Sequence, residues 1–360
     1  IKQYEQIVTK GGWPSIPSNR MIRPGDDDER ISTVRRRLRA SGDLAGKSSG
    51  YETNTFDDEL EQAVRRFQGR HGIRVTGRID RPTFAVLNVS AEARLAQLRL
   101  NYNRVRDLLN DRMEDRYVLV NVPAFQLEAV ERHEAVQRHR VIVGREGRET
   151  PQLKATIRAL NFFPYWRVPE SVATLDLIPK LRKEPEYIAK EKIRVLTGNY
   201  NGPEIDATNI DWNTADGKVI RFRQDPGPQN ALGLVRIDMP NEHGVYMHDT
   251  PLKPLFEQRG RAFSAGCVRV QGVFQLAEWI ARGEPGWDQK GRVEDVLAAG
   301  QALDLTLARP IPVYFAYITA WAEPSGRIEF RPDIYGRDGA GDGDGQKDPD
   351  APPPAPGLAP

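Results

Sequence analysis

The hydrophobic pattern of this 360-residue chain changes its period near Arg116. Before that point, apolar residues recur every three or four positions, a spacing that places them on one face of an α-helix. After it, apolar and polar residues alternate in short runs, which turns every second side chain to the same side of a β-strand. We therefore expect an α+β protein, with a helical N-terminal part followed by a β-rich domain.

The helical part divides into three predicted segments. Residues 1–28 form a short lead-in with turn signals, and residues 29–90 form a small bundle of three helices. Within the bundle, Gly72 is placed to end one helix and Asp80 to cap the start of the next. Residues 91–115 then form one amphipathic helix that connects the bundle to the β-rich domain.

The β-rich domain is expected over residues 116–320, with an insertion over residues 168–234 that is richer in Lys, Asp, Asn and Pro. An insertion of this length between strands is typical of a lid or substrate wall, and a surface excursion is the alternative. Residues 337–360 are rich in Gly, Asp, Pro and Ala, so they cannot bury enough apolar surface to fold. We expect a disordered tail there.

Composition narrows the class of protein. A chain of this length predicts two domains, and 39% hydrophobic with 28% charged residues is typical of soluble globular proteins. The net charge of +2 argues against a nucleic-acid-binding protein, which needs a concentrated basic face. No run of 18 apolar residues predicts a transmembrane helix, and no signal peptide is visible at Ile1. His71 has no second ligand at suitable spacing, so no metal site is expected.

Cys267 is the only cysteine, which excludes an internal disulfide. It follows Gly266, and His248 lies 19 residues before it. A thiolate can attack a carbonyl carbon, an imidazole can accept the thiol proton, and the backbone N–H groups of Gly266 and Cys267 can hold the oxyanion. The alternative for a free cysteine is a small buried hydrophobe. The pair indicates acyl transfer, with Cys267 as nucleophile and His248 as base.

These residues resemble the motif of the L,D-transpeptidase (YkuD) family, whose members cross-link peptidoglycan. The motif is a histidine, a gap, and then Ser/Thr-x-Gly-Cys followed by a hydrophobic residue; here 15 residues separate His248 from Ser264. Ala265 stands where many members have histidine or serine, and Arg269 stands where some have asparagine. Neither departure removes the nucleophile or the base.

Longer segments extend the resemblance to the larger, YcbB-like subgroup: residues 161–169, 223–233 and 248–264. Residues 29–90 are similar to the peptidoglycan-binding-like domain found in cell-wall enzymes. In this subgroup the segment that corresponds to residues 168–234 caps the active site. The resemblance therefore implies a YkuD-type catalytic domain with a capping insertion.

Five further residues are candidates for substrate contacts: Arg269, Ser264, Trp166, Asn230 and His243. Arg269 projects to the same face of an extended segment as Cys267, where it can bind a substrate carboxylate, favour the thiolate or form a structural salt bridge. Trp166 and Asn230 are assigned by resemblance only, and core packing is the alternative for Trp166.

A second histidine, His243, competes with His248 as the base or supports the site without touching substrate. The motif spacing favours His248. Asp249 adjoins His248, but neighbouring residues of a strand point to opposite faces, so Asp249 is not expected to orient the imidazole. By resemblance, a backbone carbonyl has that role.

The resemblance implies a peptidoglycan L,D-transpeptidase that forms 3→3 cross-links. Cys267 attacks the third residue of a tetrapeptide stem, releases the terminal D-alanine and passes the acyl group to the side-chain amine of a second stem. Inhibition by carbapenem β-lactams, action without a cofactor, and export to the periplasm or cell envelope are also implied. An L,D-carboxypeptidase or cross-link hydrolase, and a non-catalytic peptidoglycan-binding protein, are the alternatives.

Overall fold

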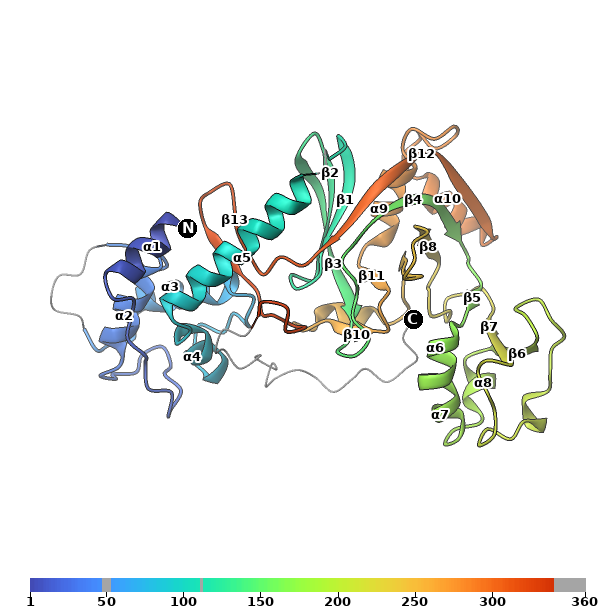
Figure 1. Ribbon diagram of the computed structural model, residues 1–360, viewed down its shortest axis with the longest axis horizontal. Helices are drawn as coiled ribbons and strands as arrows, with labels where there is room; N and C mark the ends of the chain where they lie inside the picture. The colour runs from blue at the N-terminus through green and yellow to red at the C-terminus, as the bar shows by residue number, and fades with distance from the viewer. Residues whose placement is uncertain (47–52, 111–112, 340–360) are drawn as a thin grey trace. The chain divides into compact units, whose positions relative to one another are not determined.

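Two compact units make up the part of the chain that the structure describes, which is residues 1–46, 53–110 and 113–339 (Figure 1). The structure is a computed structural model. The first unit contains the described residues up to 110 together with residues 317–339, and the second contains residues 113–316. The predicted change of pattern near Arg116 thus falls close to the boundary between the two units.

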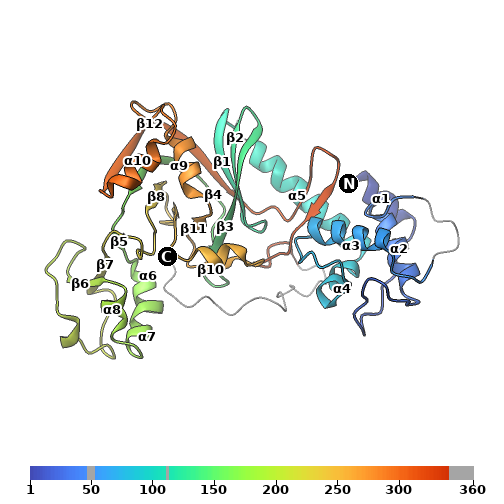
Figure 2. The ribbon, with the colours of Figure 1, turned by 180° about the vertical axis from the view of Figure 1, so that it is seen from behind.

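The described residues of the first unit form five helices and one antiparallel hairpin (Figure 2). The helices are α1 (Lys2–Thr9), α2 (Ile31–Ala40), α3 (Asp58–Arg70), α4 (Arg81–Leu87) and α5 (Ala91–Leu109), and the hairpin strands are β13 (Ala320–Ala322) and β14 (Ile328–Phe330). Asp80 caps α4 as predicted, because its side chain accepts a hydrogen bond from the Thr83 N–H. Gly72 follows α3 with a φ of +64°, the left-handed conformation that ends a helix.

The predicted lead-in contains helix α1, which its turn signals did not indicate. An isolated helix of this length is unstable in water, so α1 depends on its packing against α5. That packing buries Tyr4, whose ring meets Trp13 and Phe330 edge-on. The helical part is therefore larger than a three-helix bundle: α1, α5 and the hairpin form a second hydrophobic core in addition to the one that α2, α3 and α4 share.

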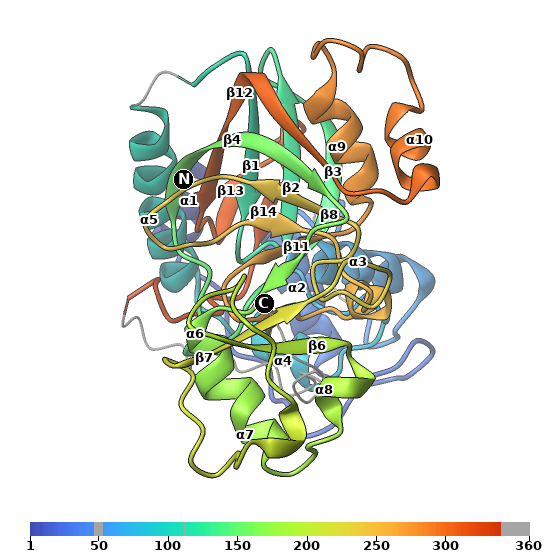
Figure 3. The ribbon, with the colours of Figure 1, turned by 90° about the vertical axis from the view of Figure 1, so that its right-hand side faces the viewer.

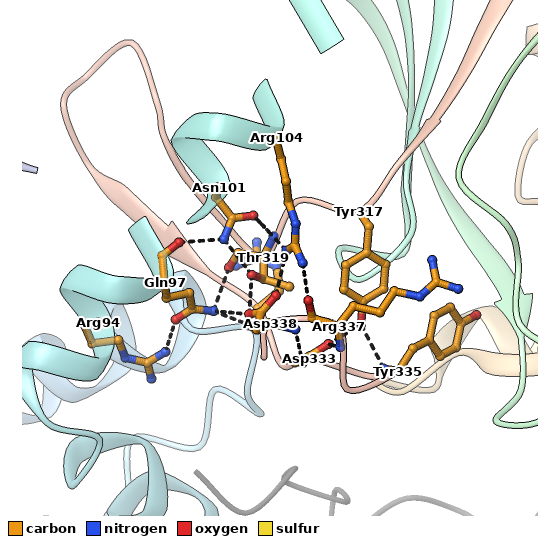
Figure 4. Close-up of polar contacts among 11 residues, drawn as sticks. Arg94, Gln97, Asn101, Arg104, Tyr317, Thr319, Asp333, Tyr335, Arg337 and Asp338 are labelled. Carbon is orange, nitrogen blue, oxygen red and sulfur yellow. Dashed lines mark hydrogen bonds and ion pairs between the residues drawn. The ribbon is translucent and has the colours of Figure 1, made fainter. Parts of the chain in front are cut away.

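The chain returns to the first unit at Tyr317, although the sequence predicts the β-rich domain as far as residue 320. Polar contacts tie the returning segment to α5 (Figure 4). Arg104 Nη1 lies 2.6 Å from Asp338 Oδ1, and the hydroxyl of Thr319 donates to Asp338 Oδ2 at 2.7 Å. Segments from both ends of the sequence thus build this unit, a long-range pairing that local patterns do not reveal.

The start of the predicted disordered tail is ordered. The N–H groups of Arg337 and Asp338 donate to the carboxylate of Asp333 at 2.8 and 2.7 Å. Acidic and basic residues here find partners within the unit, which composition alone cannot show. Residues 340–360, the rest of the predicted tail, lie outside the described residues.

One sheet is the framework of the second unit, with the strand order β10-β3-β11-β9-β8-β4-β12-β1-β2. Its strands are β1 (Arg116–Asn121), β2 (Gln126–Glu131), β3 (Glu134–Gly144), β4 (Leu153–Phe162), β8 (Val235–Asp238), β9 (Met247–His248), β10 (Ala262–Ser264), β11 (Val268–Val270) and β12 (Leu303–Ala316). The first part of β3 pairs with β2 and its later part with β11, so the sheet closes on itself (Figure 3). Helix α9 (Val273–Ala281) packs on β8, and α10 (Arg292–Ala299) packs on α9.

Between β4 and β8 the chain forms a small lobe, where the sequence predicts the insertion (Figure 1). Its elements are β5 (Trp166–Arg167), α6 (Glu170–Val172), the π-helical turn η1 (Ala173–Leu177), α7 (Ile178–Leu181), α8 (Tyr187–Lys190), β6 (Ile193–Thr197), the 3-10 turn η2 (Ala207–Asn209) and β7 (Ile220–Gln224). The strands pair in the order β5-β7-β6. Trp166, Leu177 and Phe222 belong to a hydrophobic core of the lobe's own, so the insertion is a folded element.

We expect Gly144→Ala to destabilise the second unit. The added Cβ would lie 2.1 Å from the carbonyl oxygen of Arg148 and 2.7 Å from the Thr150 nitrogen, so backbone must move. Overpacking of this kind costs about 1–3 kcal/mol or more of unfolding free energy, which urea titration measures.

Gly147→Ala is the matched control, because Gly147 has a φ of +78° but open space around its Cα. The unfolding free energy of this variant should fall only by the cost of placing alanine in the left-handed conformation, about 1–2 kcal/mol. If Gly144→Ala proves as stable as the wild type, the close approach of β3 to this loop is wrong.

Candidate active site

The two residues of the predicted catalytic pair lie on neighbouring strands. His248 ends β9 and Cys267 directly precedes β11, and the two strands run parallel with Arg269 opposite His248. By the same register Cys267 lies opposite Tyr246. Since side chains alternate along each strand, Tyr246, His248, Cys267 and Arg269 share one face of the sheet.

The imidazole of His248 is completely buried, and its Nδ1 donates to the backbone carbonyl of Asp249. This contact leaves Nε2 as the proton acceptor. Nε2 has no hydrogen-bond partner among the described residues. Burial, and next the charge of Arg269, lower the pKa of His248 to about 3, so the ring is neutral at pH 7.

Asp249 contributes its carbonyl and not its side chain to this arrangement. Its carboxylate accepts a hydrogen bond from the Leu234 N–H at 3.0 Å and pairs with Lys253. The carboxylate is thus engaged elsewhere, in keeping with the alternation argument from sequence.

The thiol of Cys267 is 7% exposed and faces the same environment. Burial raises its pKa to about 11, against smaller lowering effects of Tyr246 and Arg269. The resting pair is therefore a neutral thiol and a neutral imidazole on one face of the sheet. Tyr246, whose pKa is raised by burial and then by Cys267, was not predicted. Its position two residues before His248 on the same strand was the available signal.

A tight turn presents Cys267 to this face. Gly266 has a φ of +120°, which favours glycine. The buried hydroxyl of Ser264 donates to the Cys267 carbonyl at 2.5 Å and accepts from the Gly266 N–H at 3.1 Å. The hydroxyl of Ser264 is thus hydrogen-bonded inside the turn, and its predicted contact with substrate stays a prediction.

The same turn distinguishes the two backbone donors that were predicted to hold an oxyanion. The Gly266 N–H is bonded to Ser264, whereas the Cys267 N–H makes no hydrogen bond within the described part of the chain. The Gly266 carbonyl accepts from the Thr150 hydroxyl at 2.8 Å, which also accepts from the Gly144 N–H at 2.8 Å. Thr150 therefore fixes the turn to the end of β3.

Two arginines flank His248 on this face. Arg269 on β11 and Arg236 on β8 each lie opposite it in the strand register. Arg236 pairs with Asp238 and lies over the ring of Tyr246 at 5.0 Å. Arg269 is 1% exposed, and in the described residues its Nε and Nη1 have no partner. Arg236 was missed because only the register of β8 brings it to the site.

The other three residues predicted to contact substrate, Trp166, Asn230 and His243, lie in different surroundings within the second unit. Trp166 is buried in the core of the lobe and lines a pocket together with Arg269. The amide of Asn230 donates to the carbonyls of nearby loop residues and accepts from the Leu232 N–H, so it holds a loop together. His243 lies in an exposed turn, where its Nε2 is 3.5 Å from the carboxylate of Glu242 and its N–H donates to Asn241.

The described residues contain no group of three or more His, Cys, Asp or Glu side chains able to hold a metal ion. His71 is buried, with Nδ1 on the Phe67 carbonyl at 2.7 Å. No helix in the described ranges is both long and apolar enough to cross a membrane.

The raised pKa of Cys267 predicts slow alkylation at neutral pH. Because only the thiolate reacts with iodoacetamide and about one thiol in ten thousand is ionised at pH 7, the rate should rise about tenfold per pH unit up to pH 10. Mass spectrometry follows the adduct, with the urea-unfolded chain as the control. Fast alkylation of the folded protein that does not change between pH 6 and 8 would show an ionised resting thiol instead.

Ser264→Ala should destabilise the turn. It removes two buried hydrogen bonds and leaves the Gly266 N–H without an acceptor, which costs about 1–3 kcal/mol of unfolding free energy. Ser171→Ala, on an exposed position of α6, is the control and should change stability by less than about 0.5 kcal/mol. Equal stability of the two variants in urea would contradict the bridging role of Ser264.

Parts of the chain are similar to known protein families. Residues 115–289 match the YkuD family, described as an L,D-transpeptidase catalytic domain, and residues 27–87 match a family described as “Putative peptidoglycan binding domain”. A curated protein of Haemophilus influenzae, named “Putative L,D-transpeptidase”, is 36% identical over 222 residues. The match covers 61% of this chain and 44% of the relative, so the chain spans less than half of that protein's length.

Solved structures of the same class are more distant. The L,D-transpeptidase from Mycobacterium smegmatis is 11% identical with a TM-score of 0.28, and the match covers 56% of this chain and 58% of that one. The L,D-transpeptidase from Stackebrandtia nassauensis is 12% identical with a TM-score of 0.28, over 84% and 97%. Such TM-scores are too low to argue from, so the assignment depends on the sequence matches. Residues 115–289 are therefore a YkuD-type L,D-transpeptidase catalytic domain, and a peptidoglycan-binding domain precedes it.

Proposed function

We propose that this chain is a peptidoglycan L,D-transpeptidase that forms 3→3 cross-links, with Cys267 as nucleophile and His248 as general base. One observation carries the proposal: the only cysteine shares a sheet face with a buried histidine whose Nε2 has no partner among the described residues. Family membership supplies the substrate class, because YkuD domains are L,D-transpeptidase catalytic domains.

In the acylation step, Sγ of Cys267 attacks the carbonyl carbon of the third residue of a tetrapeptide stem. The thiol proton passes to Nε2 of His248 during the attack, because the pKa values of about 11 and about 3 disfavour an ion pair beforehand. The Cys267 N–H donates to the oxyanion. The imidazolium then protonates the departing D-alanine, and a thioester remains on Cys267.

The thioester is next captured by the side-chain amine of a second stem, which gives the cross-link and restores the thiol. Capture by water on the same acyl-enzyme would make the protein an L,D-carboxypeptidase. The peptidoglycan-binding domain supports action on the polymer, since it holds the catalytic domain near its substrate. Peptidoglycan lies outside the cytoplasm, so we infer action in the periplasm or cell envelope.

The lobe between β4 and β8 is proposed to cap the substrate. A pocket in the second unit is lined both by lobe residues such as Lys180 and Tyr187 and by Thr250 and Arg269 of the sheet region. A ligand bound there would contact both parts. Burial of the substrate under the lobe would exclude water and favour transfer over hydrolysis.

The proposal is tested by intact-protein mass spectrometry with a carbapenem and with a tetrapeptide stem. The wild type should gain one carbapenem adduct and release D-alanine from the stem, because a strained β-lactam presents a carbonyl to the same thiol. Cys267→Ala should do neither. His248→Ala should acylate about 10²–10⁴-fold more slowly.

Two other results would change the assignment. Release of D-alanine without any cross-linked dimer would identify a carboxypeptidase. Folded wild type that binds peptidoglycan but forms no adduct on Cys267 would leave a non-catalytic binding protein.

A further inference from the structure

One loop of the second unit contacts both the lobe and the turn that carries the proposed nucleophile. This bridging loop is residues 145–150, directly after β3. On its lobe side, Asp176 of η1 pairs with two of its arginines: Oδ1 lies 2.7 Å from Arg145 Nη2, and Oδ2 lies 2.7 Å from Arg148 Nη1. Arg148 also donates through Nη2 to the carbonyl of Ser171 at 2.8 Å. The lobe therefore holds the bridging loop at two residues.

The bridging loop also holds the turn that leads to the proposed nucleophile. The Arg145 N–H donates to the Ser264 carbonyl at 2.9 Å, and the Thr150 hydroxyl donates to the Gly266 carbonyl at 2.8 Å. Between these two carbonyls lies Ala265, which packs against the hydrophobic core of the lobe. The turn is thus fixed by the bridging loop at two backbone atoms and by the lobe at one side chain.

The bridging loop has little freedom to move at one end only. The Arg148 N–H donates to the Arg145 carbonyl at 2.9 Å, which closes a tight turn between the two arginines. The loop also lies against the end of β3, where the Gly144 N–H donates to the Thr150 hydroxyl at 2.8 Å. A displacement of the arginines on the lobe side would therefore move the atoms that hold the nucleophile's turn.

The contact with the lobe depends on a single negative charge. Each carboxylate oxygen of Asp176 serves one guanidinium, and the side chains of Arg148, Asp176 and Arg145 are 12%, 22% and 32% exposed. Hydrogen bonds between ionised groups are stronger than neutral ones, and partial burial reduces their screening by solvent. Without this carboxylate, the two arginines would lose the counter-charge that they share.

The local backbone around Asp176 is unusual as well. Asp176 lies in η1, a π-helical turn between α6 and α7. Such turns are rare and often occur at functional sites, because the extra residue changes the direction of the side chains. Here the turn carries the one lobe carboxylate that pairs with both loop arginines.

We propose that Asp176 is a positioning residue for Cys267. It holds the bridging loop through Arg145 and Arg148, and the loop in turn holds the turn at Gly266, so that Sγ and the N–H of Cys267 face the substrate carbonyl together. The position of the lobe is thereby coupled to the reactivity of the thiol, and a substrate bound under the lobe strengthens this alignment. The inference rests on the proposed function above.

Asp176→Asn tests the coupling, because it keeps the size of the side chain and removes its charge. Hydrogen–deuterium exchange read by mass spectrometry should become about tenfold faster at the amides of Arg145 and Gly266. The rate of acylation of Cys267 at saturating carbapenem should fall about tenfold. Asp176→Glu keeps the charge and should recover part of both effects, which a general loss of packing would not allow.

Glu204→Gln is the matched control. Glu204 is a lobe carboxylate that pairs with Arg194 of the lobe at 2.8 Å, so its removal changes the charge of the lobe without touching the bridging loop. Exchange in the turn and the acylation rate should both stay as in the wild type. Equal effects of Glu204→Gln and Asp176→Asn would overturn the proposal, because any loss of lobe charge would then suffice.

Thr150→Val tests the route through the loop, since it removes the hydroxyl that bonds the Gly266 carbonyl. In this background, Asp176→Asn should slow acylation by a smaller factor than in the wild type, because coupled residues are not additive. The same factor in both backgrounds would show that Asp176 does not act through the bridging loop and would overturn the proposal.

Two further results separate this inference from the proposed function. Absence of any adduct on wild-type Cys267 would refute the proposed function, whereas amide exchange still tests the coupling. A wild type that is acylated, with both readouts unchanged in Asp176→Asn, would refute only the positioning role. If Asp176→Asn does not fold, Arg145→Gln removes the more exposed partner and should raise exchange at Gly266 about threefold. Wild-type exchange in that variant would overturn the proposal.

Discussion

The parallel pairing of β9 with β11 is the constraint on which the proposed site depends. It sets Arg269 opposite His248, and so it brings Cys267 to the same face as the imidazole. A shift of the register by one residue would turn one strand's side chains to the other face and separate the pair. β11 also pairs with β3, so both of its edges are hydrogen-bonded within the sheet. The strand pairing thus sets the position of the thiol, and the turn at Gly266 connects Cys267 to the strand before it.

Burial gives this face its electrostatic character. Desolvation, and next the charge of Arg269, lower the pKa of His248, so the imidazole stays neutral. Desolvation raises the pKa of Cys267 against the lowering effect of the nearby arginines, so the thiol keeps its proton. An imidazolium beside these arginines would be unfavourable, so an ion pair is not expected before substrate binds. In the proposed mechanism the proton therefore moves as the substrate carbonyl is attacked.

The sequence predicted the features that depend on local chemistry. The caps at Asp80 and Gly72 could be found by their positions beside helical patterns. Residue types and spacing likewise indicate Cys267 and His248 as the candidate pair, and their catalytic roles stay a prediction. Tyr246 and Arg236 depend on strand register, which a single sequence does not specify. Local patterns also cannot show which partner a polar group finds. Ser264 has the residue type of a substrate contact, but its hydroxyl makes two hydrogen bonds within its own turn.

Arg269, a buried guanidinium with two nitrogen atoms that have no partner among the described residues, lies on β11. This strand is hydrogen-bonded along both of its edges. Removing a guanidinium from water without pairing it costs several kcal/mol, about as much as a typical domain's whole margin of stability. Arg269 can remain in this state because β11 is paired on both edges and backed by a closed sheet, so no small movement exposes it.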